Sequence, residues 1–370
     1  MSAGIALSCE GKAQFYIGNA FYRPSSQVAR DLGVLAAAVY KQKTGQLRIL
    51  EAMAATGVRS LRYWLESGAD FLWANDTNSE LEPVLSQNLQ SAIAAGIGKI
   101  SFIEANRVFF DCYLRQDFYD LVDVDSFGSP APYFSSALRA AKFGGLVYFT
   151  CTDGRTGTGH LPEHSLHCYG AFARWHPAGH EQALRLLIGR IKQEAAVLNL
   201  GVEPVFSLFA GETYRLMLQF VCETPLHSCN YGFLGYCHEC GDYQKIPWRK
   251  LGRASCPHDG AALVLSGPLW LGSLHGVGWL QAMGQLAQDW GWAKRVKLLE
   301  IMALESELPP YFYPLGEIGR RAQGDIPKKA QLLSDLQAAG YRASPTHIQA
   351  QGIKTDASLA TCLQMIQGRY

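Results

Sequence analysis

Long apolar runs are missing from this 370-residue chain. None reaches the ~20 residues that a membrane-spanning helix needs, so the sequence predicts no contact with a membrane. The first ten residues also lack the basic region and apolar stretch of a secretory signal, so we expect a cytoplasmic protein. Cysteine is not scarce, because ten cysteines are spread along the chain. In the cytosol these are predicted to be reduced thiols, with one candidate metal site among them.

An excess of charge of either sign is missing as well. The formal net charge is +1, which counts mildly against a nucleic-acid-binding protein. Basic residues nevertheless cluster late in the chain, at Arg249–Lys250 with Arg253, Lys294–Arg295 with Lys297, Arg320–Arg321, and Lys328–Lys329. Each cluster taken alone is more typical of a solvated helix face. Any contact with nucleic acid must therefore come from local patches rather than from the total charge.

Internal repeats and low-complexity tracts are also absent, and the composition that remains is that of ordinary globular cores. Hydrophobic residues make up 48% of the chain and charged residues 18%. The length exceeds the usual limit of a single hydrophobic core. Because the character of the sequence changes near Cys222, we predict two domains, residues 1–222 and residues 223–370.

The first region alternates segments of helical and strand-like pattern. Helices are predicted over residues 27–40, 58–66, 78–94 and 181–198, and strands over 47–51, 71–76, 99–104, 118–125, 144–151, 202–209 and 214–221. This alternation predicts an α/β fold with a mostly parallel sheet, whose last two strands form an antiparallel hairpin at the edge. A reversed last strand is typical of the Rossmann-like, seven-stranded sheet of class I S-adenosylmethionine-dependent methyltransferases, and it argues against a plain dehydrogenase.

Four consecutive strands of this sheet end in polar residues. They lead into Glu51-Ala-Met-Ala-Ala-Thr-Gly57, Asp76, Glu104-Ala-Asn106 and Asp123-Val-Asp125-Ser-Phe127-Gly-Ser-Pro130. In open α/β sheets, ligands bind at the carboxyl ends of the strands. A small-residue loop lets a cofactor approach the backbone, and a carboxylate beside a ring can hold the exocyclic amine of a flipped base. Taken alone, the fourth run also fits an ordinary turn.

Several motifs together resemble the tRNA guanine-26 N2-dimethyltransferase family over nearly the whole chain. They are Glu10-Gly11, Ala20-Phe21-Tyr22-Arg23-Pro24, Ala29-Arg30-Asp31-Leu32, Ala55-Thr56-Gly57-Val58-Arg59-Ser60, the run from Asp123 to Pro130, Thr150-Cys151-Thr152-Asp153, Cys168-Tyr169-Gly170, Thr346-His347 and Gly352-Ile353-Lys354-Thr355-Asp356. The chain departs from the family pattern at Arg23 and at Ala29. It also departs from it at Ser126, a position where the family has proline. Serine still permits the turn but fixes φ less tightly than proline does.

The resemblance implies that S-adenosylmethionine is the cofactor and assigns residues to each part of it. Arg30 and Arg59 would contact its charged end, where a guanidinium pairs with a carboxylate. Asp76 would take the two ribose hydroxyls. Glu104 and Ala105 would border the adenine.

The resemblance also implies a site for the target base. Phe21 and Phe127 would stack on a guanine extruded from the folded RNA, and Asp125 would accept hydrogen bonds from its N2 amine. That amine is a poor nucleophile, so methyl transfer would depend largely on positioning. The proton would leave to Asp125 or to water.

The second region contains a candidate metal site. Cys237-x-x-Cys240 is followed, after fifteen intervening residues, by Cys256-Pro-His258-Asp259, which is the spacing of a zinc ribbon over about residues 229–262. A cysteine is usual at the position of Asp259, and His258 stands beside it. Two interpretations stay open at this point: a structural zinc with Asp259 or His258 as the fourth ligand, or a ribbon that has lost its metal.

The C-terminal part predicts a small helix-rich module with an edge of strands. Residues 274–286 and 328–339 have helical patterns, and the second of these ends at Gly340. A winged-helix-like fold would present Lys328, Lys329, His347 and Lys354 to the phosphate backbone of tRNA. Such contacts position an RNA without reading its sequence.

We therefore predict a class I S-adenosylmethionine-dependent tRNA (guanine-N2)-methyltransferase with a smaller α+β C-terminal domain that binds tRNA. The expected products are mono- and dimethylguanosine at position 26, with guanine 27 left open as a further target, and no protein partner is evident. The alternatives are an N-methyltransferase of another RNA or of DNA, and a catalytically inactive RNA-binding protein of the same fold. Intact Asp125, Asp76 and Arg30 argue against the inactive form.

Overall fold

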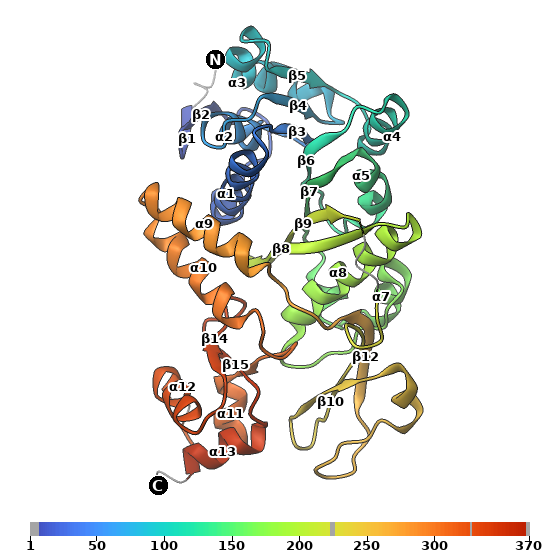
Figure 1. Ribbon diagram of the computed structural model, residues 1–370, viewed down its shortest axis with the longest axis vertical. Helices are drawn as coiled ribbons and strands as arrows, with labels where there is room; N and C mark the ends of the chain where they lie inside the picture. The colour runs from blue at the N-terminus through green and yellow to red at the C-terminus, as the bar shows by residue number, and fades with distance from the viewer. Residues whose placement is uncertain (1–6, 223–225, 326–327, 368–370) are drawn as a thin grey trace.

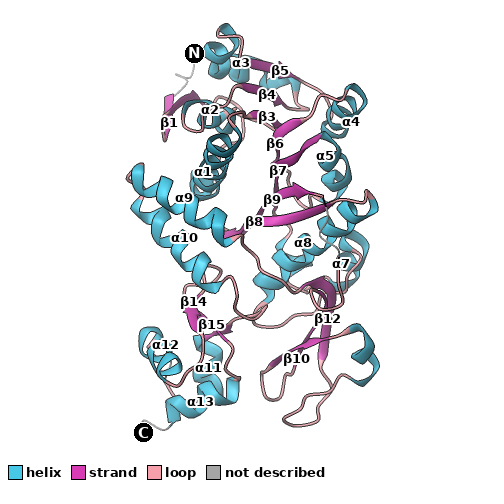
Figure 2. Ribbon diagram, in the orientation of Figure 1, coloured by secondary structure: helices cyan, strands magenta, loops and turns pink. Residues whose placement is uncertain are grey.

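The computed structural model describes residues 7–222, 226–325 and 328–367. Figures 1 and 2 show an elongated molecule with a seven-stranded sheet and its helices toward the N-terminus and small sheets toward the C-terminus. None of the described helices is both long and apolar enough to cross a membrane.

The central sheet is mostly parallel and has one reversed strand. Its members are β3 (Arg48–Glu51), β4 (Phe71–Asn75), β5 (Gly98–Ser101), β6 (Tyr119–Val124), β7 (Ala141–Cys151), β8 (Gly201–Ala210) and β9 (Thr213–Val221). Their spatial order is β5-β4-β3-β6-β7-β9-β8. The pairs from β5 to β7 are parallel, whereas β9 is antiparallel to both β7 and β8. The predicted sheet, including its reversed last strand, is confirmed.

Both faces of this sheet are apolar and covered by helices. Helices α1 (Gln27–Thr44), α2 (Val58–Leu65) and α3 (Glu82–Ala94) lie on one face, and α4 (Ala105–Arg115), α5 (Phe134–Ala140) and α8 (Gly179–Val197) lie on the other (Figure 1). Since neighbouring residues of a strand point to opposite faces, Ile49 belongs to the core beneath α1 and Leu50 to the core beneath α5 and α8. Two covered faces explain why the strands read as continuous apolar runs.

Sequence reasoning missed several short helices of this region. They are α4, α5, α6 (Gly154–Gly157), α7 (Pro162–Tyr169) and the 3-10 turns Pro24–Ser26, Ser79–Leu81 and Ala131–Tyr133. Helix α4 leaves Phe110, Tyr113 and Leu114 exposed, which obscures the helical period of its buried residues. The others are too short for a period to stand out.

An N-terminal hairpin brings residues before α1 over the sheet. Strands β1 (Leu7–Glu10) and β2 (Ala13–Tyr16) pair antiparallel. Phe15 is buried in one cluster with Val58 of α2 and Leu85 of α3. The hairpin is therefore anchored on the helix layer, and the chain between Tyr16 and α1 passes beside the carboxyl ends of the parallel strands.

The chain beyond residue 225 first forms a three-stranded antiparallel sheet and then returns to the central one. The small sheet contains β10 (Tyr231–Tyr236), β11 (Tyr243–Ile246) and β12 (Val264–Trp270) in the order β11-β10-β12, with the 3-10 helix Trp248–Arg253 beside it. Helices α9 (Val277–Asp289) and α10 (Ala293–Glu305) then pack on α1, with Met283 and Met302 buried in the same core as Leu35. The second region thus shares a core with the first.

The last part is a second small sheet with three helices. Strands β13 (Tyr313–Pro314), β14 (Ala343–Pro345) and β15 (Gly352–Thr355) form it in the order β13-β15-β14, and α11 (Leu315–Ala322), α12 (Lys329–Ala338) and α13 (Leu359–Gln367) accompany it. The strands pair antiparallel and the helices lie beside them, so the predicted α+β character of the C-terminal part is confirmed.

Candidate active site

A cavity of about 540 Å³ lies at the carboxyl ends of the parallel strands. We call it the rim cavity. Six of the residues predicted to bind cofactor or base line it: Phe21, Arg30, Arg59, Asp76, Asp125 and Phe127. They come from the N-terminal loop, from α1 and α2, and from the ends of β4 and β6. The fold therefore brings together residues that are far apart in the sequence.

Asp125 is held at this cavity by two arginines. The Arg59 Nη2 donates to Asp125 Oδ2 at 2.6 Å, and Arg215 Nη2 of β9 lies 3.7 Å from Asp125 Oδ1. The Asp125 side chain stays 31% exposed. Burial works against its charge, but the positive charges of Arg59 and Arg215 outweigh this and lower the pKa of Asp125. The carboxylate is therefore ionised, fixed in direction and open to the cavity on one side.

Arg59 is itself fixed by the neighbouring carboxylate Asp123. The Arg59 Nη1 donates to both oxygens of Asp123, at 2.7 and 2.8 Å, and the Tyr63 hydroxyl donates to Asp123 Oδ2 at 2.8 Å. Asp123 is fully buried, and burial is the main cause of its raised pKa. Burial, with the nearby Asp123 charge, also raises the pKa of Glu51 to about 8. The arginine thus joins a buried acid below the rim to the accessible acid at the rim.

The loop after Asp125 is tied to the end of β7 although it lacks proline. The buried Ser126 hydroxyl donates to the carbonyl of Thr150 at 3.3 Å. The Gly128 N–H donates to Thr152 Oγ1 at 2.7 Å, and the Thr152 N–H donates to the Gly128 carbonyl at 2.9 Å. Gly128 has φ 69°, a conformation that favours glycine. These bonds restrict the loop where the ring of a proline would otherwise have restricted it.

The two predicted stacking rings meet at the cavity. Phe21 is 58% exposed and Phe127 is 73% exposed, which is unusual for large apolar side chains. Their ring centroids are 5.1 Å apart and the rings are tilted by 76°. Two exposed rings beside a charged cavity form a surface suited to a flat, partly polar ligand.

The loop between β3 and α2 also lines the rim cavity. Ala55 adopts φ 46°, a strained conformation for a residue with a Cβ, and its N–H donates to Asp76 Oδ2 at 2.9 Å. Asp76 Oδ1 accepts from the N–H of Asn78 at 3.0 Å. Gly57, at φ 75°, precedes the first turn of α2. Asp76 is therefore fixed at the end of β4 beside a loop of small residues.

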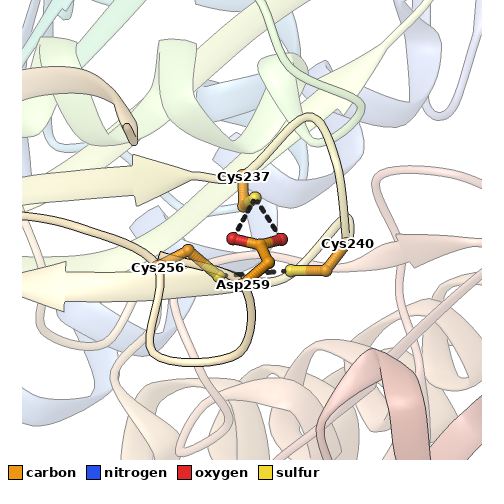
Figure 3. Close-up of side chains that lie close together, drawn as sticks. All are labelled: Cys237, Cys240, Cys256 and Asp259. Carbon is orange, nitrogen blue, oxygen red and sulfur yellow. Dashed lines mark hydrogen bonds between the residues drawn. The ribbon is translucent and has the colours of Figure 1, made fainter. Parts of the chain in front are cut away.

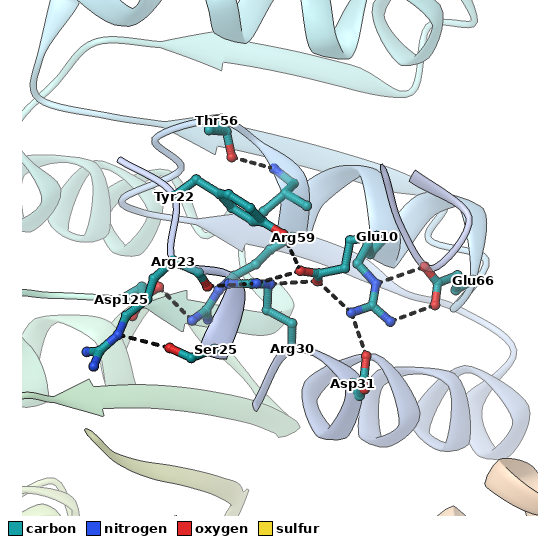
Figure 4. Close-up of polar contacts among 12 residues, drawn as sticks. Glu10, Tyr22, Arg23, Ser25, Arg30, Asp31, Thr56, Arg59, Glu66 and Asp125 are labelled. Carbon is teal, nitrogen blue, oxygen red and sulfur yellow. Dashed lines mark hydrogen bonds and ion pairs between the residues drawn. The ribbon is translucent and has the colours of Figure 1, made fainter. Parts of the chain in front are cut away.

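Arg30 takes part in a buried ion-pair network around Glu10 (Figure 4). Its Nε and Nη2 donate to the two oxygens of Glu10 at 2.6 and 2.5 Å, and Glu10 also accepts from Arg62 Nη1 at 2.8 Å and from the Tyr22 hydroxyl at 2.8 Å. The Arg30 Nη2 also donates to the Arg23 carbonyl. Arg30 thus links the N-terminal hairpin to the loop that carries Phe21, while it still lines the cavity.

Two predicted cofactor residues lie elsewhere. Among the residues that the structure describes, Glu104 and Ala105 do not line the rim cavity. Glu104 caps α4, where its carboxylate accepts from the N–H groups of Asn106 and Arg107 at 3.0 Å each. Ala105 is buried in the core beneath α4. Sequence reasoning missed the capping role because the exposed apolar residues of α4 obscure the helix that follows Glu104.

Sequence reasoning gave no role to Arg215, which the structure brings to Asp125. Its Nη1 atom is buried and has no hydrogen-bond partner among the described residues. Arg215 interrupts the apolar pattern of β9, and a charged residue within a buried strand is the signal that could have identified it.

The predicted zinc ligands form a compact cluster (Figure 3). Cys237 Sγ is 3.3 Å from Asp259 Oδ2, and Cys240 Sγ is 3.4 Å from Cys256 Sγ. His258 faces away from this cluster, since its Nε2 lies 3.0 Å from Asp242 Oδ2. The arrangement brings Asp259, and not His258, to the fourth position.

The four residues predicted to contact tRNA fall into two pairs. Lys328 is exposed at the start of α12, and Lys329 Nζ donates to the Ala350 carbonyl at 2.8 Å. The Lys354 side chain is 1% exposed and its Nζ pairs with Glu181 at 2.6 Å. The His347 side chain is fully buried, and its Nδ1 contacts Glu305. Buried side chains cannot reach a phosphate backbone, so the prediction was wrong for His347 and Lys354.

Known proteins resemble this chain over almost its whole length. A family model described as N2,N2-dimethylguanosine tRNA methyltransferase matches residues 7–367. The tRNA (guanine(26)-N(2))-dimethyltransferase of Saccharolobus solfataricus is 31% identical over 94% of this chain and 90% of that protein. The enzyme of the same name from Pyrococcus abyssi is 28% identical over 94% of this chain and 95% of that protein.

A solved structure matches the fold as well. It is a complex of Trm1 from Pyrococcus horikoshii with S-adenosyl-L-methionine, with a TM-score of 0.83 and 26% identity. The match covers 97% of this chain and 99% of that one. Together with the strand order described above, it identifies the fold as that of a class I S-adenosylmethionine-dependent methyltransferase with additional C-terminal sheets.

Proposed function

Since the chain belongs to the N2,N2-dimethylguanosine tRNA methyltransferase family, we propose that it transfers methyl groups from S-adenosylmethionine to the N2 amine of guanine 26 in tRNA. The observation that carries this proposal is the position of Asp125. It is an ionised carboxylate, fixed between Arg59 and Arg215, that opens into a cavity beside two exposed rings. An acceptor and flat surfaces at one cavity are what recognition of a flipped guanine requires.

Asp125 would act as a hydrogen-bond acceptor for the amine. Bound S-adenosylmethionine would supply the electrophilic methyl group. A carboxylate that accepts the N2 hydrogen atoms increases electron density on the nitrogen and fixes its direction. Because the pKa of Asp125 is lowered, the carboxylate is a weak base, and the proton would pass on to water.

Phe21 and Phe127 would hold the extruded base by stacking. Their rings already touch, so a guanine placed between them would require the rings to separate. Both belong to loops, Phe21 before α1 and Phe127 after β6, and each ring is mostly exposed. Rotation of the exposed side chains can therefore separate the rings, while hydrogen bonds of Ser126 and Gly128 hold the backbone on either side of Phe127.

The remaining rim residues would hold the cofactor. Asp76 lies at the end of β4, where a carboxylate commonly takes ribose hydroxyls. Arg30 lines the cavity, and its pairing with Glu10 fixes the guanidinium in place. The Arg59 guanidinium already donates to Asp123 and Asp125. A carboxylate of the cofactor would be its third acceptor. Glu104 and Ala105, at the start of α4, would border the adenine only from outside the rim cavity.

The C-terminal part would bind tRNA by its backbone. We assign the chemistry to residues 1–222 and the RNA contacts to residues 223–370, with a winged-helix-like module formed by β13–β15 and α11–α13. Lys328 and Lys329, at the start of α12, would contact phosphates. Since its substrate is a tRNA, the protein would work in the cytoplasm.

The cysteine cluster would hold a structural zinc. Three thiol groups and a carboxylate are a donor set that zinc accepts, and the ligand atoms lie within 4.8 Å of one another. The residues present therefore fit the metal. It would join the turn after β10 to the turn before β12, far from the rim cavity, and would take no part in methyl transfer.

The experiment is transfer of radiolabel from S-adenosylmethionine to unmodified tRNA, followed by nucleoside analysis and mapping of the modified position. Mono- and dimethylguanosine at position 26 is the expected result, and mapping also shows whether position 27 receives methyl groups. Label in DNA or another RNA, but not in tRNA, would contradict the proposal. Binding of tRNA without any transfer would mean an inactive RNA-binding protein.

A further inference from the structure

A second cavity adjoins the rim cavity. It measures about 410 Å³, and we call it the hairpin cavity. Thr152, Arg155, His180, Phe209, Glu212 and Tyr214 are among the residues that line it. Thr152 also lines the rim cavity, so the two cavities meet at the end of β7.

Strand β9 separates the two cavities. Thr213 and Arg215 line the rim cavity, whereas Glu212 and Tyr214 line the hairpin cavity. This is the alternation of side chains on opposite faces of one strand. The turn before β9 is rigid, because Ala210 pairs with Thr213 and the two residues between them have φ of 57° and 64°. The wall between the cavities is therefore fixed by backbone geometry.

The hairpin cavity contains a stacked pair of rings. The His180 and Phe209 centroids are 4.0 Å apart and the rings are tilted by only 17°. Between His180 Nδ1 and the Tyr214 hydroxyl there is a hydrogen bond of 2.7 Å, which fixes the imidazole. Burial lowers the pKa of His180, and the neighbouring His160 adds to this effect. The pair thus provides an uncharged, flat surface next to the proposed methylation site.

The cavity also offers a positive charge. Arg155 is exposed, and its guanidinium forms no ion pair or hydrogen bond within the described part of the chain. Glu212 lies on the hairpin turn at the same cavity. A flat surface, a free guanidinium and one acceptor are what binding of a nucleotide uses: stacking for the base, a charged hydrogen bond for the phosphate, and an acceptor for an exocyclic amine.

We propose that the hairpin cavity binds the nucleotide next to the target guanine, with His180 and Phe209 under its base and Arg155 on its phosphate. The inference rests on the proposed function and adds a second nucleotide subsite to it. Extruding a guanine from a folded RNA draws its covalently linked neighbour toward the protein. A cavity separated from the rim cavity by a single strand is where that neighbour arrives.

The first test replaces Arg155 by alanine in the full-length protein and measures methyl transfer to tRNA. The KM for tRNA is expected to rise about tenfold, the effect of one lost charge-assisted hydrogen bond, while kcat and cofactor affinity stay unchanged. The matched control is Arg115→Ala, an exposed arginine at the end of α4 that lines neither of the two cavities. Equal KM values for the two variants would overturn the proposal.

The second test detects stacking directly. 2-Aminopurine placed at tRNA position 25 or 27 is expected to change fluorescence at one of the two positions when wild-type protein binds, and to do so less with Arg155→Ala. No difference between the two proteins at either position would overturn the proposal. If wild-type protein neither binds nor methylates tRNA, the proposed function fails first, and the two failures are thereby distinguished.

Discussion

Asp125 and Glu305 are both carboxylates flanked by two nitrogen-containing side chains, and they serve opposite purposes. Asp125 lies between Arg59 and Arg215 and stays 31% exposed at a cavity. The Glu305 side chain is 1% exposed, contacts His347 Nδ1 and lies 3.7 Å from His275 Nε2. Both carboxylates have lowered pKa values because of these neighbours, although burial opposes the shift.

The difference between them is access. One side of Asp125 faces the rim cavity, so a ligand can use it. Glu305 joins α10 to the loop after β14 and to the chain before α9, and it is closed to solvent. A lowered pKa therefore marks a paired acid in both places, and only accessible geometry marks a binding site.

The largest effect is expected from Asp125→Ala. Loss of the acceptor should lower kcat for tRNA methylation by about 10²–10³-fold, the usual consequence of removing one positioned hydrogen-bonding group from an active site. The free energy of unfolding should fall by less than for a fully buried acid, because Asp125 is partly exposed and Arg59 keeps its bonds to Asp123. Asp125→Asn, which keeps one acceptor oxygen, is the control, and its kcat should lie between those of the wild type and Asp125→Ala. Near-wild-type kcat in Asp125→Ala would exclude the proposed role.

Glu305→Ala should show the opposite pattern. Removing one member of a buried charged cluster leaves its partners without hydrogen bonds and costs about 3 kcal/mol of unfolding free energy. Chemical denaturation with urea measures this loss. The kcat per folded molecule should remain close to wild type, because Glu305 does not line the rim cavity. A kcat loss as large as that of Asp125→Ala would remove the distinction between the two acids.

The buried cluster should also make the protein sensitive to acid. Burial lowers the pKa of His275 from its ordinary 6.5 to about 4. The unfolded chain therefore takes up this proton at a higher pH than the folded one. Stability is fully present above pH 6.5 and is lost as the pH falls toward 4, by roughly 3 kcal/mol for this group. His176, whose pKa burial also lowers to about 4, adds a similar loss.

The variant His275→Gln distinguishes the contribution of His275 to acid sensitivity from that of His176. It removes one titrating group, so the slope of unfolding free energy against pH between 6.5 and 4 should fall by about 1.4 kcal/mol per pH unit. Urea denaturation at a series of pH values measures that slope. An unchanged slope would show that the cluster is protonated in the folded state and that His275 is not the acid-sensitive group.

The metal cluster allows a comparison of two adjacent residues. Asp259→Ala should lower bound zinc below one atom per chain, because Asp259 lies with the three cysteines. His258→Ala should keep the metal, because His258 contacts Asp242 instead. Elemental analysis of the purified proteins measures both. Zinc near zero in the wild-type protein would mean that the ribbon has lost its metal. Loss of zinc in His258→Ala, but not in Asp259→Ala, would mean that His258 and not Asp259 is the fourth ligand.

The mostly parallel sheet and its final antiparallel hairpin could be predicted because local patterns indicate both. Alternating helices and strands imply a parallel sheet, and the short turn at Gly211 and Glu212 implies the final hairpin. The ends of the strands then identified Asp76 and Asp125. Arg215 and Asp123 stayed without a role, because their function depends on which strands become neighbours, and β9 inserts between β7 and β8.

Burial was the property that sequence could not supply. His347 and Lys354 stand in polar, motif-like segments that resemble surface loops, yet α10 and α8 cover them through Glu305 and Glu181. In a sequence, an exposed polar residue of a loop cannot be distinguished from a polar residue of a buried pair. The distinction requires knowledge of the partner, which comes from a distant part of the chain. Glu104 shows the same limit, since a helix start and a ligand-binding rim both favour an acid there.

The smallest effect is expected from the two lysines that remain candidates for tRNA contact. Lys328→Ala combined with Lys329→Ala should weaken tRNA binding only a few-fold, because each lysine neutralises at most one phosphate among many. The more telling measurement is salt dependence: the slope of log affinity against log salt should become shallower by about one unit per lost phosphate contact. Lys329 also donates to the Ala350 carbonyl, so Lys328 is the freer of the two lysines. Lys328→Ala alone should therefore show most of the change in slope that the double variant shows. An unchanged slope in both variants would place the RNA contact outside α12. Exposure of a lysine would then have failed to identify the RNA interface, as the sequence motif around the buried Lys354 failed.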